Sequence, residues 1–258
     1  MRADMRSVGR RRPVELQEEK MHLPNWFDVF HSVCARGQEA LEWGLPEPWI
    51  HAELYAELKR QAPSTGWAPL STEVPYVTFY PVQLPKKENR DWEAVGAIKW
   101  VDLCLRSEAD KAWCWFEFKA RHAGLRGRKQ KAALAARDAL CKDAVALMGF
   151  DAALTADTWA NPDRYTVAYW FESVLKPHTA SLHTDEHHFA AVFLQLGDKL
   201  DPEIWNEKAL MEQIRKWFSY RAKQTGRQFA CPDINIASSV QSLAGNHSLL
   251  VCEWPAYS

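Results

Sequence analysis

The chain has 258 residues, of which 47% are hydrophobic and 25% charged, and its formal net charge is −1 at pH 7. A chain of this length can bury a substantial core, as one large domain or as a core with additions. The balanced charge excludes a global basic field, so any affinity for nucleic acid must come from a local patch. No run of about 18 apolar residues occurs, and we therefore expect no membrane contact.

The six cysteines form no CxxC pair and show no zinc-binding spacing. Cys104, Cys114 and Cys141 fall in apolar strand or helix contexts, where free thiols are typical. This usage predicts a reducing environment and a cytoplasmic location.

The first 21 residues are charged and lack apolar periodicity, which predicts a disordered tail or a start assigned too far upstream of Met21. Residues 22–258 are expected to form a single α/β domain. Amphipathic periodicity predicts helices over residues 24–43 and 49–61, the second ended by Pro63.

Residues 73–84 are β-branched and aromatic and include two prolines, a pattern typical of a first strand at a sheet edge or with a bulge. A hairpin follows, with strands over residues 98–106 and 113–120 joined by the charged segment SEADK. Its period of two places Val101, Leu103 and Leu105 on one face of the first strand and Asp102 on the other.

Further along the chain, an alanine- and leucine-rich segment predicts a helix over residues 130–148, ended by Gly149. The remaining elements are expected as strands over 164–173, 189–196, 234–239 and 248–254 and as a helix over 202–221.

The hairpin carries charges among apolar residues, which is costly unless the charges are paired or used. Asp102 lies on the first strand, and Glu117 and Lys119 share a face of the second. Two carboxylates can bind Mg²⁺, whose other ligands are water and substrate phosphate, and Lys119 would then orient or deprotonate the attacking water. The alternative is a buried ion pair with a structural role only.

Asp102 followed by Glu117-Phe118-Lys119 resembles the signature of the PD-(D/E)xK nuclease superfamily, which has the restriction-endonuclease-like fold. Val101 stands where the family's proline is usual. The resemblance implies an α-β-β-β-α-β core with a mixed central sheet flanked by helices, here about residues 49–173. It also implies Mg²⁺, with Mn²⁺ as a substitute. An N-terminal helix and an α+β extension over 174–258 would complete the fold.

The resemblance further implies a glutamate on the helix before the first core strand, close to the metal. Glu53 is the first choice and Glu57 the second, although their spacing is equally typical of a solvated helix face. Members similar to RecB and lambda exonuclease place a tyrosine four residues after a glutamine on the helix after the hairpin. This chain has Gln130 but Leu134, which does not support that subfamily.

A basic cluster follows the hairpin and is the expected nucleic-acid contact, although a solvated helix start is the alternative. Besides His122, its members are Arg121, Arg126, Arg128, Lys129 and Lys131. His183 and His187 have the i, i+4 spacing of helical metal ligands, but the segment HTDEHH is more typical of a polar lead-in to a strand.

Three hypotheses follow from the sequence. The first is a Mg²⁺-dependent nuclease that hydrolyses phosphodiester bonds, in DNA rather than RNA, in restriction, defence or DNA processing. The second is a non-catalytic member of the same fold that binds or assembles with a partner. The third is an unrelated α/β protein with a structural ion pair and a dry, closed site. A homodimer or a partner subunit would fit the first two.

Overall fold

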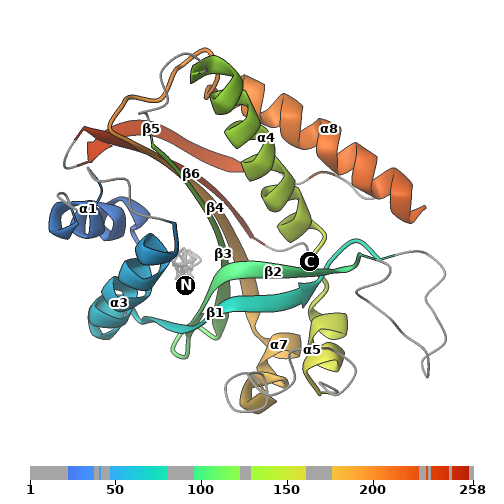
Figure 1. Cartoon of the computed structure of the whole chain (residues 1–258). Coiled ribbons are helices and arrows are strands. Elements are labelled where there is room, and N and C mark those ends of the chain that lie inside the picture. Colours follow the sequence, from blue (N-terminus) through green and yellow to red (C-terminus); the bar gives the residue numbers. More distant parts are fainter. Residues whose placement is uncertain are drawn as a thin grey trace, which may run out of the picture.

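The computed structural model describes residues 23–37, 41, 47–80, 96–122, 129–160, 176–226, 231, 234–243 and 246–255. Its centre is a mixed sheet of six described strands in the order β1-β2-β3-β4-β6-β5, with helices on both faces (Figure 1). The predicted α/β class with a mixed, helix-flanked sheet is therefore confirmed. The predicted tail over residues 1–21 lies outside the described residues.

The first three strands form an antiparallel meander, and the next pair is parallel. The strands are β1 (Trp67–Val77), β2 (Ile98–Ser107), β3 (Ala112–His122), β4 (Glu186–Leu196), β5 (Asn235–Leu243) and β6 (His247–Pro255). Strand β3 runs parallel to β4, and α4 lies between them in the sequence, as a parallel crossover requires. Strand β6 then pairs antiparallel with both β4 and β5.

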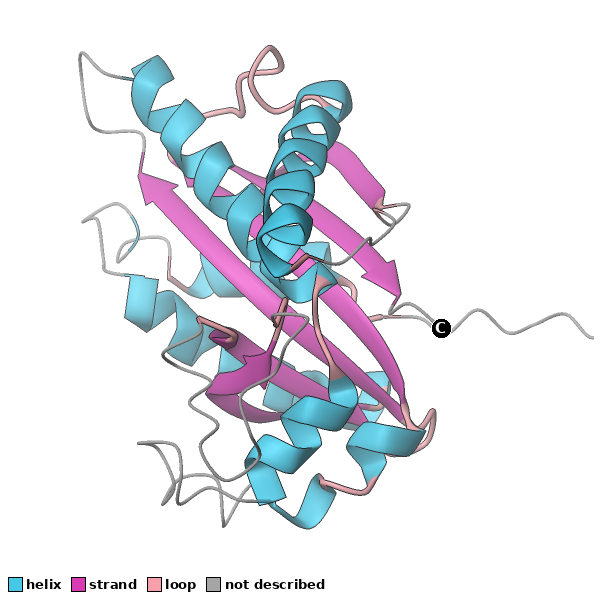
Figure 2. Ribbon diagram, turned by 90° about the vertical axis from the view of Figure 1, so that its right-hand side faces the viewer, coloured by secondary structure: helices cyan, strands magenta, loops and turns pink. Residues whose placement is uncertain are grey.

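The helices divide between the two faces of the sheet. On one side, α1 (Trp26–Arg36) and α3 (Glu47–Thr65) cover Phe116 and Phe118 of β3. On the other, α4 (Lys129–Met148), α5 (Ala152–Ala160) and α8 (Glu207–Thr225) cover Trp113 and Trp115. Figure 2 shows helices in front of the strands and behind them. No helix in the described part of the chain is long and apolar enough to cross a membrane.

Several boundaries differ from the prediction. The first strand is β1, six residues earlier than expected, but it is an edge strand with a register shift between Pro69 and Ser71, as predicted. Helix α3 does not end before Pro63 but continues to Thr65. The proline lies in the last turn of the helix, where the hydroxyls of Ser64 and Thr65 bond to the carbonyl of Gln61.

The strand parallel to β3 is β4, which the sequence placed in the C-terminal extension. The predicted strand over 164–173 lies outside the described residues. The described sheet continues past residue 173 through β4, β6 and β5, and the predicted division into core and extension stays a prediction. Chain order hid this pairing, since α4, α5 and α7 (Ser181–Thr184) all intervene.

The predicted hairpin is present, but the alternation of its faces breaks at Asp102. Val101 packs in the same core cluster as Cys104, whereas Leu103 packs on the opposite face. The described β2–β3 register ends at Leu103 and Phe116, and Asp102 Oδ2 accepts the backbone N–H of Phe118 at 2.6 Å just beyond it. A carboxylate thus replaces a backbone partner where the two strands separate.

Candidate active site

Glu117 is the most deeply buried acid of the hairpin, with 4% of its surface exposed. Burial raises the pKa of Glu117 well above its usual value, and the nearby charges of Asp102 and Asp143 raise it further, against the opposing effect of Lys119. A hydrogen bond to Asp102 also favours the protonated form of Glu117. The structure therefore brings the two predicted carboxyl groups together, in surroundings that favour the protonated form of Glu117.

Helix α4 adds an acid that the sequence analysis did not identify. The Lys119 ammonium lies 3.2 Å from Asp143 Oδ2, and about a third of each side chain is exposed. Burial raises the pKa of Asp143, and Lys119 opposes that shift. Asp143 lies three residues after Leu140 and four before Leu147, both buried. These spacings place Asp143 on the apolar face of the helix, and a charged residue on such a face is a signal by which the sequence could have identified it.

A buried tyrosine hydroxyl also faces this group of charges. Tyr76 of β1 is fully buried, and its hydroxyl has no hydrogen-bond partner among the described residues. Burial raises the pKa of Tyr76, and the charges of Glu117, Asp143 and Asp102 raise it further. A neutral phenol that can donate a hydrogen bond therefore lies close to the three acids.

On the opposite face of the sheet, His51 of α3 shares a small cavity with Asp102. A cavity of about 10 Å³, enough for one water molecule, is lined by His51, Leu54, Asp102, Leu103 and Phe116. The Nε2 atom of His51 is buried and has no partner within the described part of the chain. A water molecule in this cavity would give the Nε2 atom of His51 a hydrogen-bond partner beside Asp102.

The structure places Glu53 and Glu57, the two predicted helix acids, beside Arg36 of α1. Arg36 lies 3.5 Å from Glu53 Oε2, and it also pairs with the buried carboxylate of Glu57. Glu57 accepts further hydrogen bonds from Arg60 and Gln61. This network joins α1 to α3.

Burial alone would raise the pKa of Glu57, but hydrogen bonds from two arginines and Gln61 outweigh it and lower the pKa from 4.5 to about 2. We expect Glu57→Gln to cost about 2 kcal/mol of folding free energy at pH 7. A lowered carboxyl pKa stabilises the fold above pH 4.5, and that contribution is lost as the pH falls toward 2. Denaturant unfolding should therefore show the wild-type advantage at pH 7 and a smaller one at pH 3. Glu53→Gln, the matched control, should cost about 0.5 kcal/mol or less.

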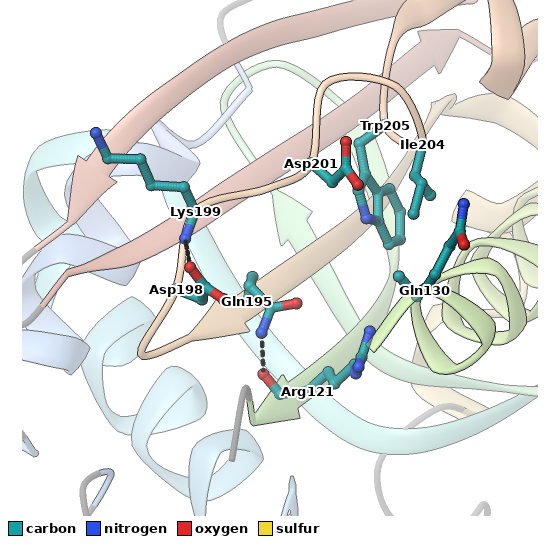
Figure 3. Close-up of a pocket in the computed structure, with 9 residues that line it drawn as sticks. Arg121, Gln130, Gln195, Asp198, Lys199, Asp201, Ile204 and Trp205 are labelled. Carbon is teal, nitrogen blue, oxygen red and sulfur yellow. Dashed lines mark hydrogen bonds between the residues drawn. The ribbon is translucent and has the colours of Figure 1, made fainter. Parts of the chain in front are cut away.

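The predicted basic cluster is only partly described. Arg121, at the end of β3, lines a cavity beside the start of α4, and Lys131 is exposed on that helix (Figure 3). Lys129 is the first residue of α4. Arg126 and Arg128 lie outside the described residues.

His183 and His187 do not lie on one helix. His183 belongs to α7, whereas His187 is a buried residue of β4. The Nδ1 atom of His187 accepts a hydrogen bond from Trp115 Nε1 at 3.1 Å, and its Nε2 lies 3.0 Å from the carbonyl of Leu182. Burial lowers the pKa of His187 to about 4, so the ring is neutral and structural.

The described residues contain no group of three or more His, Cys, Asp or Glu side chains arranged to hold a metal ion. Mg²⁺ needs only one or two protein carboxylates, and water and phosphate complete its shell. Asp102 and Glu117 supply two such carboxylates side by side, and a divalent cation would have to displace the proton that burial favours on Glu117.

The chain was compared with protein-family models, with curated proteins and with solved structures, and none of them matches it.

Proposed function

We propose that this protein is a Mg²⁺-dependent nuclease of the restriction-endonuclease-like class that hydrolyses phosphodiester bonds in DNA. The observation that carries the proposal is the adjacency of Asp102 and the buried Glu117 on the hairpin, with Lys119 two residues further along β3. The order α3-β1-β2-β3-α4-β4, with β3 parallel to β4, agrees with the core order of that superfamily.

In this proposal each residue has a separate task. Asp102 and Glu117 hold the cation, which when bound makes a water molecule more acidic and neutralises charge on the phosphate. Asp143 Oδ2 lies 3.2 Å from the Lys119 ammonium and holds it in place. The N–H groups of Lys119 can then orient the attacking water. The neutral hydroxyl of Tyr76 is buried near the acids, where it could donate a hydrogen bond to a group bound there.

DNA is the proposed substrate, with Arg121, Lys129 and Lys131 near the start of α4 as backbone contacts. With a net charge of −1, the chain would depend on this local patch, on a second copy or on a partner subunit for affinity. A location in the cytoplasm and a role in restriction or DNA processing belong to the same proposal.

One observation favours a non-catalytic binding protein as the second candidate. Lys119 is already paired with Asp143, so its charge is matched without substrate. In that case the site would be a structural remnant, and the fold would serve a partner protein.

A cleavage assay on supercoiled plasmid and on single-stranded DNA separates the two candidates. The nuclease predicts cutting with Mg²⁺ or Mn²⁺, no cutting with EDTA, and loss of cutting in Asp102→Asn. Asp138→Asn on α4 is the matched control, because Asp138 pairs with Lys142 and faces Trp217 of α8. No cutting by the wild type, together with no Mn²⁺ binding by calorimetry, would overturn the nuclease and favour the binding protein.

A further inference from the structure

A second cavity, of about 350 Å³, lies where β3 and β4 end beside the start of α4 (Figure 3). We call it the strand-end cavity. Its lining residues are Arg121, Gln130, Ala133, Gln195, Asp198, Lys199, Asp201, Ile204 and Trp205. The carboxyl ends of parallel strands are the usual place for ligands in α/β sheets, and this volume suits a small organic group.

The lining is both apolar and polar. Trp205 and Ile204 form an apolar wall, and the Trp205 ring is fixed by stacking on Phe193 at 4.1 Å between centroids. Figure 3 shows Arg121 extending toward Gln130, with Asp201 and Trp205 across the cavity. Amide, carboxylate and guanidinium groups together offer donors and acceptors beside an aromatic surface.

The charges of the lining argue against a phosphate as the occupant. Asp198 and Asp201 contribute two carboxylates, and the Lys199 side chain points away from the other lining groups (Figure 3). Among these described lining residues, Arg121 is the cation whose side chain extends toward the cavity (Figure 3). A nucleobase with its sugar is uncharged. The base is flat and carries hydrogen-bonding edges that amides and carboxylates can recognise.

The strand-end cavity and the proposed active site lie along the same strand, β3. Glu117, Lys119 and Arg121 are alternate residues of one strand, so they share a face and are spaced about 7 Å apart. Arg121 is also in register with Gln195 of β4, whose amide lies 3.3 Å from the Arg121 carbonyl. A phosphate at Lys119 would therefore place a neighbouring nucleotide of the same strand at the cavity.

We propose that the strand-end cavity holds one unpaired nucleoside unit of a single-stranded DNA segment whose phosphate lies at Asp102, Glu117 and Lys119. This inference rests on the proposed nuclease function and adds the class of substrate. A base within a duplex is stacked and paired, so it enters a cavity only at the cost of unstacking and unpairing, whereas an unpaired base can stack on aromatic side chains directly. Single strands, overhangs and frayed ends are the substrates that fit.

The test measures binding without metal, so that no cleavage interferes. Fluorescence anisotropy in EDTA would compare a short labelled single strand with its duplex on the full chain. Gln130→Leu should weaken single-strand binding about tenfold and leave duplex binding unchanged. Gln224→Leu, an exposed position on α8, is the matched control and should change neither. Arg121→Ala should weaken binding of both forms, since it removes a cation near the backbone.

A series of strands with one abasic position each identifies the occupant. One abasic position should weaken binding to the wild type about tenfold and binding to Gln130→Leu by less, because both changes remove the same amide contact. Equal binding of intact and abasic strands by the wild type would overturn the inference. A free mononucleotide that binds as tightly as the strand would overturn the assignment to a strand.

The binding test and the cleavage assay can fail separately. A protein that passes this test but cuts neither plasmid nor single strands would keep the cavity and lose the nuclease. A protein that cuts duplex plasmid but binds intact and abasic strands equally would keep the nuclease and lose the cavity.

Discussion

Lys119→Ala is expected to lower the rate of Mg²⁺-dependent DNA cleavage by about 10²- to 10⁴-fold, the range that a positioned proton-transfer or orienting group contributes. The ammonium of Lys119 lies next to Asp143 and on the same face of β3 as Glu117. Loss of the ammonium removes the group that orients water, while both carboxylates stay in place. The affinity for Mn²⁺, measured by calorimetry, should therefore change little.

Lys142→Ala provides the matched control for this variant. Lys142 lies on α4 next to Asp143 in sequence, but its ammonium is 2.8 Å from Asp138 and lies over the Trp217 ring of α8. It has the same charge and a place on the same helix, yet it faces away from the site. Equal loss of cleavage in both variants, or none in Lys119→Ala, would contradict the role given to Lys119.

Glu117→Gln should stabilise the metal-free protein and abolish its stabilisation by metal. The pKa of Glu117 is raised in the folded protein, so above pH 4.5 the unfolded chain releases a proton that the folded chain retains. The stability due to Glu117 is thus full below pH 4.5 and falls as the pH rises. A neutral amide avoids this loss, so we expect a melting temperature a few degrees higher at pH 7.5, since about 1 kcal/mol corresponds to about 2–4 °C.

In the presence of metal ions the wild type should become more stable than Glu117→Gln. Mn²⁺ at about 100 times its Kd should stabilise the wild type by about 2.7 kcal/mol, and binding should strengthen as the pH rises because the carboxyl proton must leave. Glu117→Gln should show no such shift. Glu253→Gln on β6 is the control, because burial also raises the pKa of Glu253. That variant should keep the full response to metal, and a full response in Glu117→Gln would exclude Glu117 as a ligand.

The parts of the fold that were predictable depend on local periodicity. Alternating residues located the hairpin strands β2 and β3, and an alanine- and leucine-rich run located α4 to within one residue. Asp102, Glu117 and Lys119 could be singled out because charges inside such patterns are unusual.

The remainder depends on tertiary packing. Asp143 reaches Lys119 only because α4 packs on β3, and His51 reaches Asp102 only because α3 covers the opposite face. The break in alternation at Asp102 arises where the β2–β3 ladder ends, and no residue pattern signals it. The network of Arg36 and Glu57 likewise joins two helices that are separate in sequence.

The parallel pairing of β3 with β4 has a consequence for the order of events during folding. The β2–β3 hairpin is local and can form early, when its carboxylates are still hydrated. Strand β4 can reach β3 only after a long loop closes, as the pairing of Ala112 with Glu186 shows. The Glu117 environment becomes dry only when α4 and β4 have docked. Proton uptake by Glu117 should therefore be a late step in folding, and refolding in a weakly buffered indicator dye should show it lagging behind hairpin formation.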